Sequence, residues 1–195
     1  MQKEIEIKVR LNNVAKVRDY LEKEANPLGE KEQIDTYFVM PEIDFFEEKP
    51  VHRYLRVRQH LQASGSIDLH VCNLDGNNKL LWTDEYECKL ENPEVMLTIF
   101  DKIGLIRRVT VKKQRQKFKY QDFVITIDEI DSLGTFIEIE ITTEEELDED
   151  KAKFIKNRCF ECLEQIQAEW EKVPDLGYPE LILKKERLTK DPLSA

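Results

Sequence analysis

Apolar and polar residues alternate strictly over the opening stretch EIEIKVRL. This period-two pattern predicts a β-strand with one apolar face and one polar face. Glu4 and Glu6 then point the same way, about 6.7 Å apart. They repel each other by about 2.5 kcal/mol at an effective dielectric constant of about 20, and by only ~0.6 kcal/mol in water. A strand that faces solvent tolerates this pair, whereas an enclosed face requires a cation beside it.

The same alternation recurs along the rest of the chain. Further strands are predicted at EQIDTYFVM, RYLRVRQH, SIDLHV, TDEYECKLE, RRVTVKKQRQKFKY, FVITIDEI and TFIEIEIT. An Asp-Gly hairpin signal lies in NLDGNNK, between two of them. Many strands with turn signals between them favour an antiparallel sheet that closes, or nearly closes, into a barrel.

Three segments show apolar residues at helical spacing. The first, NNVAKVRDYLEKEA, ends before Pro27, and the second runs from Asn92 to Gly104. The apolar side of the second consists of Val95, Met96, Ile99 and Phe100. The third is predicted from Thr143 to about Trp170. The expected fold class is therefore α+β, an eight-stranded antiparallel barrel with helices packed outside, as one domain over residues 1–183 followed by a polar tail at 184–195.

Composition and charge narrow the classes of function. The chain has 195 residues, 41% of them hydrophobic, which is enough for one good-sized core. Its formal net charge of -10 at pH 7 repels a nucleic-acid backbone, so a polyanion requires a local basic patch. No apolar run reaches the ~20 residues of a membrane span, and no apolar signal segment follows a basic head. We therefore expect a cytoplasmic protein that binds no membrane.

Both charge signs recur on the polar faces of the predicted strands. The acidic residues are Glu4, Glu6, Glu85, Glu87, Asp128, Glu138 and Glu140. The basic residues are Lys8, Arg10, Arg56, Arg58, Lys89, Lys113, Arg115 and Lys117. On any one strand such a face is more often solvated, with ion pairs worth little. The opposite faces are apolar, however, and if the helices cover them the charged faces turn toward the barrel interior.

A charged barrel interior suits a phosphorylated ligand bound with a metal. An eight-stranded barrel has room inside for one small ligand. Lys and Arg suit phosphate oxygens, because guanidinium forks bind them in pairs. Clustered carboxylates suit Mg²⁺ or Mn²⁺, which take oxygen ligands and bridge to substrate phosphates. The cation that Glu4 and Glu6 require is then a metal, and Lys8 belongs to the phosphate that it brings.

These motifs resemble those of the CYTH superfamily, the triphosphate tunnel metalloenzymes. EIEIK is similar to the family's ExExK signature, and QIDTYF, YLRVR, DEYECKLENPE, VKKQRQKF and ITIDEIDSLGTFIEIEI follow in the family's order, from Glu4 to about Leu183. GYPELI resembles the end of class IV adenylyl cyclase-like members. The resemblance implies a metal-dependent enzyme that converts ATP to cyclic AMP and pyrophosphate. The alternative is a triphosphatase that hydrolyses thiamine triphosphate, inorganic triphosphate or a nucleoside triphosphate.

The resemblance also implies roles for individual residues. The implied ligands of Mg²⁺ or Mn²⁺ are Glu4, Glu6, Asp128, Glu138 and Glu140. The implied triphosphate contacts are Lys8, Arg56, Arg58, Lys113 and Arg115, of which Lys8, Arg58 and Lys113 are also the candidate catalytic residues. His70 stands where the family commonly has a lysine, and is a further candidate phosphate contact. Glu85, Glu87 and Tyr178 are secondary candidates.

Two functions of other classes remain open. The barrel could bind a nucleotide or polyphosphate without turning it over, although a pure anion binder gains nothing from paired carboxylates. The basic stretch RRVTVKKQRQKFKY could bind RNA, although alternation places its Lys113 and Arg115 among the acids of other strands. The expected partner is a small-molecule triphosphate rather than a nucleic acid, and a homodimer is an open alternative for the assembly.

Overall fold

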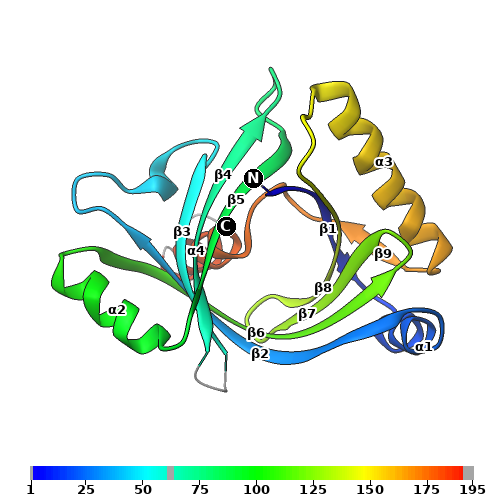
Figure 1. Ribbon diagram of the computed structural model, residues 1–195, viewed down its shortest axis with the longest axis horizontal. Coiled ribbons are helices and arrows are strands. Elements are labelled where there is room, and N and C mark those ends of the chain that lie inside the picture. The colour runs from blue at the N-terminus through cyan, green and yellow to red at the C-terminus, as the bar shows by residue number, and fades with distance from the viewer. Residues whose placement is uncertain (1, 61–63, 191–195) are drawn as a thin grey trace.

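The described residues, 2–60 and 64–190 of the computed structural model, contain nine β-strands in one antiparallel sheet. The strands are β1 (Gln2–Leu11), β2 (Asn26–Val39), β3 (Arg53–His60), β4 (Gly65–Leu74), β5 (Leu80–Leu90), β6 (Ile106–Tyr120), β7 (Phe123–Ile130), β8 (Gly134–Thr143) and β9 (Trp170–Lys172). Their order is β5-β4-β3-β2-β6-β7-β8-β1-β9, and β1 also pairs with β5. That additional pairing closes eight strands into a barrel, with the short β9 beside β1 (Figure 1).

The barrel closes over a short stretch only. β1 pairs with β5 over Gln2–Glu4, opposite Thr83–Glu85. Along most of its length β1 pairs with β8, and β9 pairs with the other edge of β1 at Val9–Leu11. The wall is therefore sealed at the start of β1, and within the described chain β1 and β5 are not paired beyond that point.

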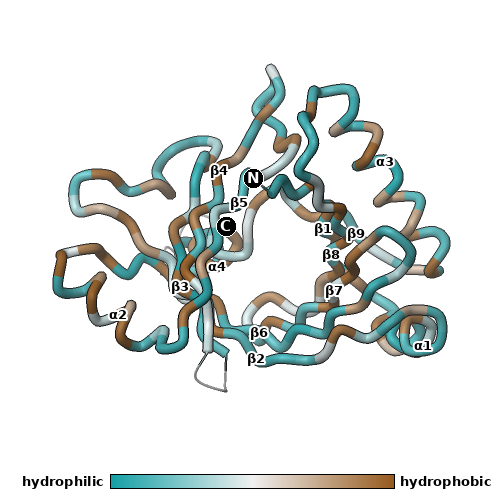
Figure 2. The backbone as a smooth tube through the Cα atoms, viewed as in Figure 1, coloured by the Kyte–Doolittle hydropathy of each residue, from teal (hydrophilic) through white to brown (hydrophobic). Residues whose placement is uncertain are grey.

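Four helices of the described chain lie outside the barrel. They are α1 (Val14–Glu24), α2 (Pro93–Lys102), α3 (Glu149–Gln165) and α4 (Tyr178–Lys190), with a short 3-10 turn at Phe45–Glu47. The largest apolar core lies between α1, α3 and the outer face of the sheet. Its members include Ile5, Ile7, Val9, Val17, Leu21, Ile125, Ile137, Ile139 and Leu163. The alternating hydropathy of the strands that produces this core is visible in Figure 2. The predicted α+β barrel is confirmed. The apolar residues of this core face outward toward the helices, whereas a second core that includes Tyr37, Val111 and Phe136 lies on the same strand faces as Asp35, Lys113 and Glu138.

The predicted bounds of the third helix are too wide. The pattern predicts a helix from Thr143 to about Trp170, but α3 begins at Glu149 and ends at Gln165. Thr143 pairs with β1 as the last residue of β8, where a β-branched side chain fits the sheet. Trp170 begins β9, after a left-handed residue at Gln167 (φ 54°) has ended the helical path. Strand pairing at both ends therefore shortens the helix.

The second helix begins where predicted, but its buried face differs. The side chain of Asn92 accepts a hydrogen bond from the backbone N–H of Val95 at 3.2 Å, which is the expected cap. Leu97 and Phe100 are the buried apolar residues, whereas Val95 and Ile99 are 52% and 44% exposed. The buried face is therefore rotated from the one predicted.

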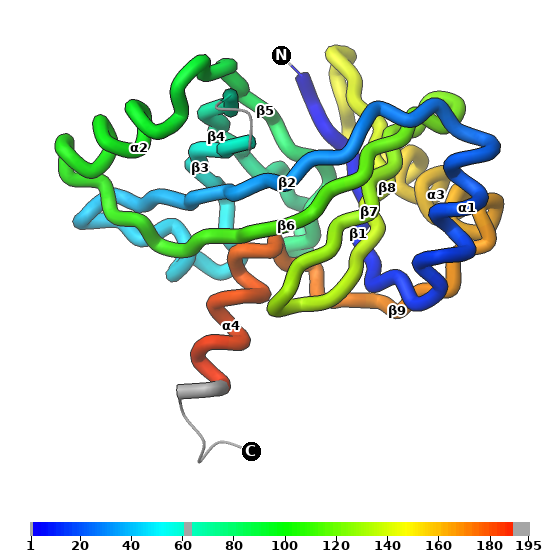
Figure 3. The backbone as a smooth tube through the Cα atoms, turned by 90° about the horizontal axis from the view of Figure 1, so that it is seen from below, coloured from blue at the N-terminus to red at the C-terminus, as the bar shows by residue number. Residues whose placement is uncertain are grey.

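The predicted polar tail begins inside a helix. α4 continues from Tyr178 to Lys190 and projects from one end of the barrel (Figure 3). Residues 184–190 are thus helical, and residues 191–195 of the predicted tail lie outside the described residues. Within the described chain, no helix combines the length and the apolarity that crossing a membrane requires.

Candidate active site

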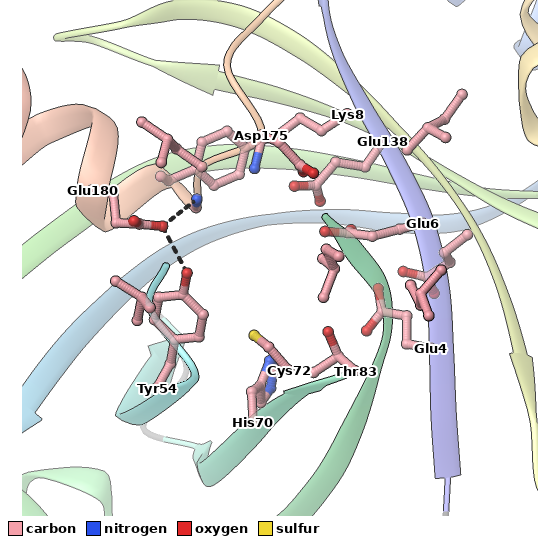
Figure 4. A pocket seen from close by; sticks show the side chains of 18 of the residues that line it. Glu4, Glu6, Lys8, Tyr54, His70, Cys72, Thr83, Glu138, Asp175 and Glu180 are labelled. Carbon is pink, nitrogen blue, oxygen red and sulfur yellow. Dashed lines mark hydrogen bonds between the residues drawn. The ribbon is translucent and has the colours of Figure 1, made fainter. Parts of the chain in front are cut away.

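A cavity of about 1070 Å³ occupies the barrel interior. The predicted site residues that line it are Glu4, Glu6, Lys8, Arg56, Arg58, His70, Glu85, Glu87, Lys113, Arg115, Glu138, Glu140 and Tyr178. Figure 4 shows Glu4, Glu6 and Lys8 of β1 pointing into this space, with Glu138 beside them. Asp128 is the exception, because it is fully buried and does not belong to the lining. The fold therefore gathers the predicted residues from six strands and α4 around one space.

Two of the arginines are held by buried aspartates on neighbouring strands. Arg58 donates Nε and Nη2 to the carboxylate of Asp35 at 2.7 and 2.8 Å. Arg56 donates Nε to Asp68 at 2.8 Å. Burial alone would raise the pKa of Asp35, but Arg58 and Lys113 outweigh it and hold that pKa well below its usual range. Each aspartate fixes one edge of a guanidinium group and leaves further N–H donors for a ligand.

Asp128 and Glu138 form a second set of pairs with Arg115 and Lys113. Arg115 donates Nε to Asp128 at 2.6 Å and Nη2 to Glu138 at 2.5 Å. The ammonium of Lys113 lies 3.7 Å from Asp128, and burial together with the neighbouring Arg115 lowers the pKa of Lys113 to about 8. Although burial opposes ionisation of Glu138, Arg115 lowers its pKa. Both carboxylates are thus balanced by cations.

Glu4 and Glu6 are in the opposite situation. Neither forms an ion pair within 4 Å in the described part of the chain. Burial is the main reason that the pKa of Glu4 is raised well above its usual range, and repulsion from Glu140 and Glu6 adds to it. Burial and the charge of Glu138 likewise raise the pKa of Glu6 from 4.5 to about 7. Negative charge is therefore crowded on this side of the cavity without enough positive charge to balance it.

The carboxylates on this side of the cavity are chemically suited to bind a divalent cation. Glu6 lies opposite Glu140, and Lys8 opposite Glu138, in the register of β1 with β8. Carboxylate oxygens are the ligands that Mg²⁺ and Mn²⁺ prefer. Among residues 2–60 and 64–190, no three carboxylate, His or Cys groups already converge on one ion position. Binding would thus require these side chains to turn toward one another.

The placement of Asp128 does not support the metal-ligand role predicted for it. Its carboxylate lies behind the cavity lining, and Arg115 binds both of its oxygens. Although burial opposes its ionisation, Lys113 and Arg115 lower the pKa of Asp128. Unlike Glu138, Asp128 does not line the cavity and so offers no carboxylate oxygen to a metal bound there. Asp128 holds Arg115 in place, as Asp35 does for Arg58.

Tyr178, at the start of α4, closes one side of the cavity. It is 5% exposed, and its ring centroid lies 4.7 Å from the ammonium of Lys8 and 5.2 Å from that of Lys113. Glu180, in the first turn of α4, accepts hydrogen bonds from the Tyr54 hydroxyl at 2.7 Å and the Gly177 backbone N–H at 2.9 Å (Figure 4). The start of α4 is therefore anchored to β3 across the cavity.

The family model described as the CYTH domain matches residues 2–165. The chain belongs to the CYTH family. A curated relative from Methanocaldococcus jannaschii, named as a candidate adenylate cyclase, is 30% identical over 149 residues. The match covers 76% of this chain and 82% of that protein.

Solved structures share the CYTH fold. A candidate adenylate cyclase from Vibrio parahaemolyticus has a TM-score of 0.72 at 19% identity, with 92% of this chain and 97% of that chain covered. The protein HpAC1 from Hippeastrum, described as an adenylyl cyclase candidate with a dominant triphosphatase activity, has a TM-score of 0.61 at 17% identity. That comparison covers 95% of this chain and 96% of the other. At these identities the likeness demonstrates the fold alone.

Membership explains the charged interior. CYTH enzymes are adenylyl cyclase-like enzymes or triphosphatases, and they bind triphosphate substrates. The family is one of triphosphate tunnel metalloenzymes, and membership of it implies a divalent metal. The family resemblance drawn from the motifs is therefore confirmed.

His70 occupies the place where the CYTH pattern commonly has lysine, but it does not replace the charge. Its Nε2 lies 3.3 Å from Nη2 of Arg56 and 3.4 Å from a carboxylate oxygen of Glu85. Burial, with the nearby charges of Arg56 and Arg58, lowers the pKa of His70 well below 6.5. The ring is therefore neutral at pH 7, and its candidate phosphate contact would be a hydrogen bond rather than an ion pair.

Asp35 and Asp68 were missed by the sequence reasoning. Both lie on the inner faces of their strands, in the segments QIDTYF and SIDLHV. The signal was present, because the alternation places Asp68 on the same face as His70. The alternation does not show which residue lies opposite on the neighbouring strand. In the structure Asp35 lies opposite Arg58, and Asp68 lies opposite Arg56.

Proposed function

We propose that this CYTH protein is a divalent-metal-dependent enzyme that converts ATP to cyclic AMP and pyrophosphate. The observation that carries the proposal is the division of one cavity lining into a basic side and an acidic side. The basic side consists of Lys8, Arg56, Arg58, Lys113 and Arg115. The acidic side consists of Glu4, Glu6, Glu138 and Glu140. The volume of about 1070 Å³ accommodates an organic group as well as three phosphates.

The acidic side would hold Mg²⁺ or Mn²⁺ through Glu4, Glu6, Glu138 and Glu140. A bound divalent cation neutralises phosphate charge and polarises the bond that breaks. Because Glu4 and Glu6 lack a cation partner among the described residues, they gain most from such an ion. Asp128 takes a different role in this proposal and positions Arg115.

The basic side would align the triphosphate for reaction. Lys8, Arg58 and Lys113 are the candidate catalytic residues, because fixed positive charges stabilise the negative charge that builds up on the phosphates. In the cyclase reaction, the ribose 3′-oxygen bonds to the α-phosphorus while the bond from that phosphorus to the bridging oxygen breaks. Pyrophosphate leaves, and the hydroxyl proton passes to solvent.

Hydrolysis by the same lining is the second candidate. In a triphosphatase, water attacks the terminal phosphate instead of the 3′-hydroxyl attacking the α-phosphate. The description of HpAC1 as dominantly a triphosphatase supports this candidate by fold analogy. Two observations count against the RNA-binding alternative: Lys113 is 4% exposed, and Arg115 is paired inside the barrel.

The products formed from different triphosphates separate these functions. We expect the protein, incubated with ATP and Mg²⁺ or Mn²⁺, to release cyclic AMP and pyrophosphate in equal amounts, measured by chromatography. Thiamine triphosphate and inorganic triphosphate serve as parallel substrates, and Glu6→Gln as the inactive control. Orthophosphate with ADP, or rapid hydrolysis of inorganic triphosphate, would identify a triphosphatase. Tight binding with no product from any of the three would contradict both enzyme functions.

A further inference from the structure

The lining of the cavity continues past the charged interior to residues on α3, on β9 and at the start of β5, and we call this part of the lining the side compartment. β1 and β5 separate after Glu4 within the described chain, and α3 and β9 lie next to β1 at this opening (Figure 1). The side compartment is lined by Lys156, Phe160, Trp170, Asp175, Leu80 and Leu81. Lys156 of α3 donates a hydrogen bond to the backbone carbonyl of Leu80 and so bridges the opening.

Two partly exposed aromatic rings line the side compartment. The ring centroids of Phe160 and Trp170 are 5.8 Å apart, with 39° between the ring planes. Phe160 is 40% exposed and Trp170 is 38% exposed, so neither side chain is buried in the apolar core. Aromatic side chains that face a cavity offer a stacking surface to any planar ring system. The metal and phosphate contacts of the barrel interior make no use of these rings.

Polar groups of both kinds lie beside the rings. The ammonium of Lys156 is a hydrogen-bond donor, and the carboxylate of Asp175 is an acceptor. Figure 4 shows Asp175 among the residues that line the same cavity as Lys8 and Glu138. Burial lowers the pKa of Lys156, while the negative charges of Asp175 and Glu6 oppose that change. Lys156 is thus within electrostatic reach of the acidic side of the barrel interior.

We propose that the side compartment binds the nucleobase of the triphosphate substrate. Phe160 and Trp170 provide the stacking surface, and Lys156 and Asp175 contact the polar edge of the base. A base that carries a ring nitrogen acceptor next to an exocyclic amine, as adenine does, complements this donor and acceptor pair. The inference rests on the proposed function, since it names the organic part of the substrate whose phosphates enter the barrel.

Binding measurements with and without the base test this assignment. The two probes are an ATP analogue with a methylene group between the α- and β-phosphates, which cannot be cyclised, and inorganic triphosphate. Both are titrated calorimetrically in Mg²⁺. We expect Trp170→Ala to weaken binding of the analogue about tenfold, the loss of one stacking contact, and to change inorganic triphosphate affinity less than twofold. Trp170→Leu keeps an apolar side chain and should show the same selectivity.

Phe154→Ala is the matched control. Phe154 lies on the same helix as Phe160 but is 65% exposed and does not line the cavity, so both affinities should stay at the wild-type value. Equal weakening of both ligands by Trp170→Ala and Trp170→Leu, or no weakening of the analogue, would overturn the nucleobase assignment while leaving the proposed function intact. If neither ligand binds the wild-type protein, the proposed function fails and the assignment fails with it.

Discussion

Replacement of Glu6 by glutamine is expected to stabilise the metal-free protein at pH 8 and to abolish turnover. Burial and the charge of Glu138 raise the pKa of Glu6 from 4.5 to about 7, so an ionised Glu6 destabilises the folded state. This cost is absent below pH 4.5, grows as the pH rises toward 7, and is complete above it. The gain from Glu6→Gln should therefore be about 1 to 3 kcal/mol at pH 8 and smaller at pH 5.5.

Melting curves in chelator and in excess Mn²⁺ measure this effect. Mn²⁺ should stabilise the wild-type protein and give little stabilisation to Glu6→Gln, because the metal binds only the folded state through these carboxylates. Activity on any triphosphate substrate should fall by orders of magnitude in the variant. A Glu6→Gln protein that is less stable than wild type in chelator at pH 8 would mean that the acidic side is not electrostatically crowded.

Glu138→Gln is the contrasting variant. Glu138 accepts a hydrogen bond from Arg115 at 2.5 Å, and its pKa is lowered. Loss of this charge-assisted bond should cost about 1.5 to 3 kcal/mol of stability in chelator. The two variants thus distinguish Glu6, which is crowded by like charges, from Glu138, which is paired with Arg115. Equal behaviour of both variants in chelator would contradict this distinction.

Arg58→Ala is expected to reduce both stability and triphosphate affinity. Arg58 makes two hydrogen bonds to Asp35, which is fully buried. Loss of Arg58 leaves Asp35 with only the longer contacts to Lys113 at 3.5 Å and Arg56 at 3.8 Å, and should cost about 3 kcal/mol of stability, the lower end of the range for a broken buried pair. Loss of a phosphate contact should weaken binding by about 1.5 to 3 kcal/mol. Urea unfolding and calorimetric titration of inorganic triphosphate measure the two effects.

Lys8→Met separates the two effects. Lys8 packs on the ring of Tyr178 and forms no ion pair within 4 Å in the described chain. At pH 5.5, where Glu6 is largely protonated, loss of Lys8 should change stability by no more than about 1 kcal/mol. Triphosphate affinity should still fall by about 1.5 to 3 kcal/mol. Wild-type affinity in Lys8→Met would remove Lys8 from the binding site.

Alternation of side chains made the barrel and its charged interior predictable. The opening EIEIK and the later FIEIEI each carry the period of two that fixes which face is apolar. Since the apolar faces are the ones that helices can cover, the inward direction of Glu4, Glu6 and Lys8 followed from the pattern. The burial of Ile5, Ile7, Ile137 and Ile139 in the core on the outer face of the sheet agrees with that reasoning.

The state of each carboxylate was not predictable from that pattern, because it depends on strand register. Alternation alone treats Glu138 like Glu6 and predicts that Glu138→Gln leaves the metal-free protein unchanged or slightly more stable. In the fold, Arg115 lies opposite Asp128 and also reaches Glu138, which reverses this prediction. Register arises from turns and from packing across the whole barrel, and no short motif encodes it.

The side compartment, like the state of each carboxylate, could not be predicted from the sequence. It combines Leu80 and Leu81 of β5 with Phe160 of α3 and Trp170 of β9, which are far apart in the chain. Trp170 was predicted to lie on a helix that packs against the sheet. Only the pairing of β9 with β1 brings its ring to the cavity.

The central claim is that the barrel interior binds a triphosphate together with a divalent metal. Its most direct test is a crystal structure of the protein with Mn²⁺ and the non-cyclisable ATP analogue, with Mn²⁺ located by anomalous scattering. We expect the Mn²⁺ signal beside Glu4, Glu6 and Glu138, and the phosphates in contact with Lys8, Arg58 and Lys113. An Mn²⁺ signal away from these carboxylates, or phosphates bound outside the barrel, would contradict the claim.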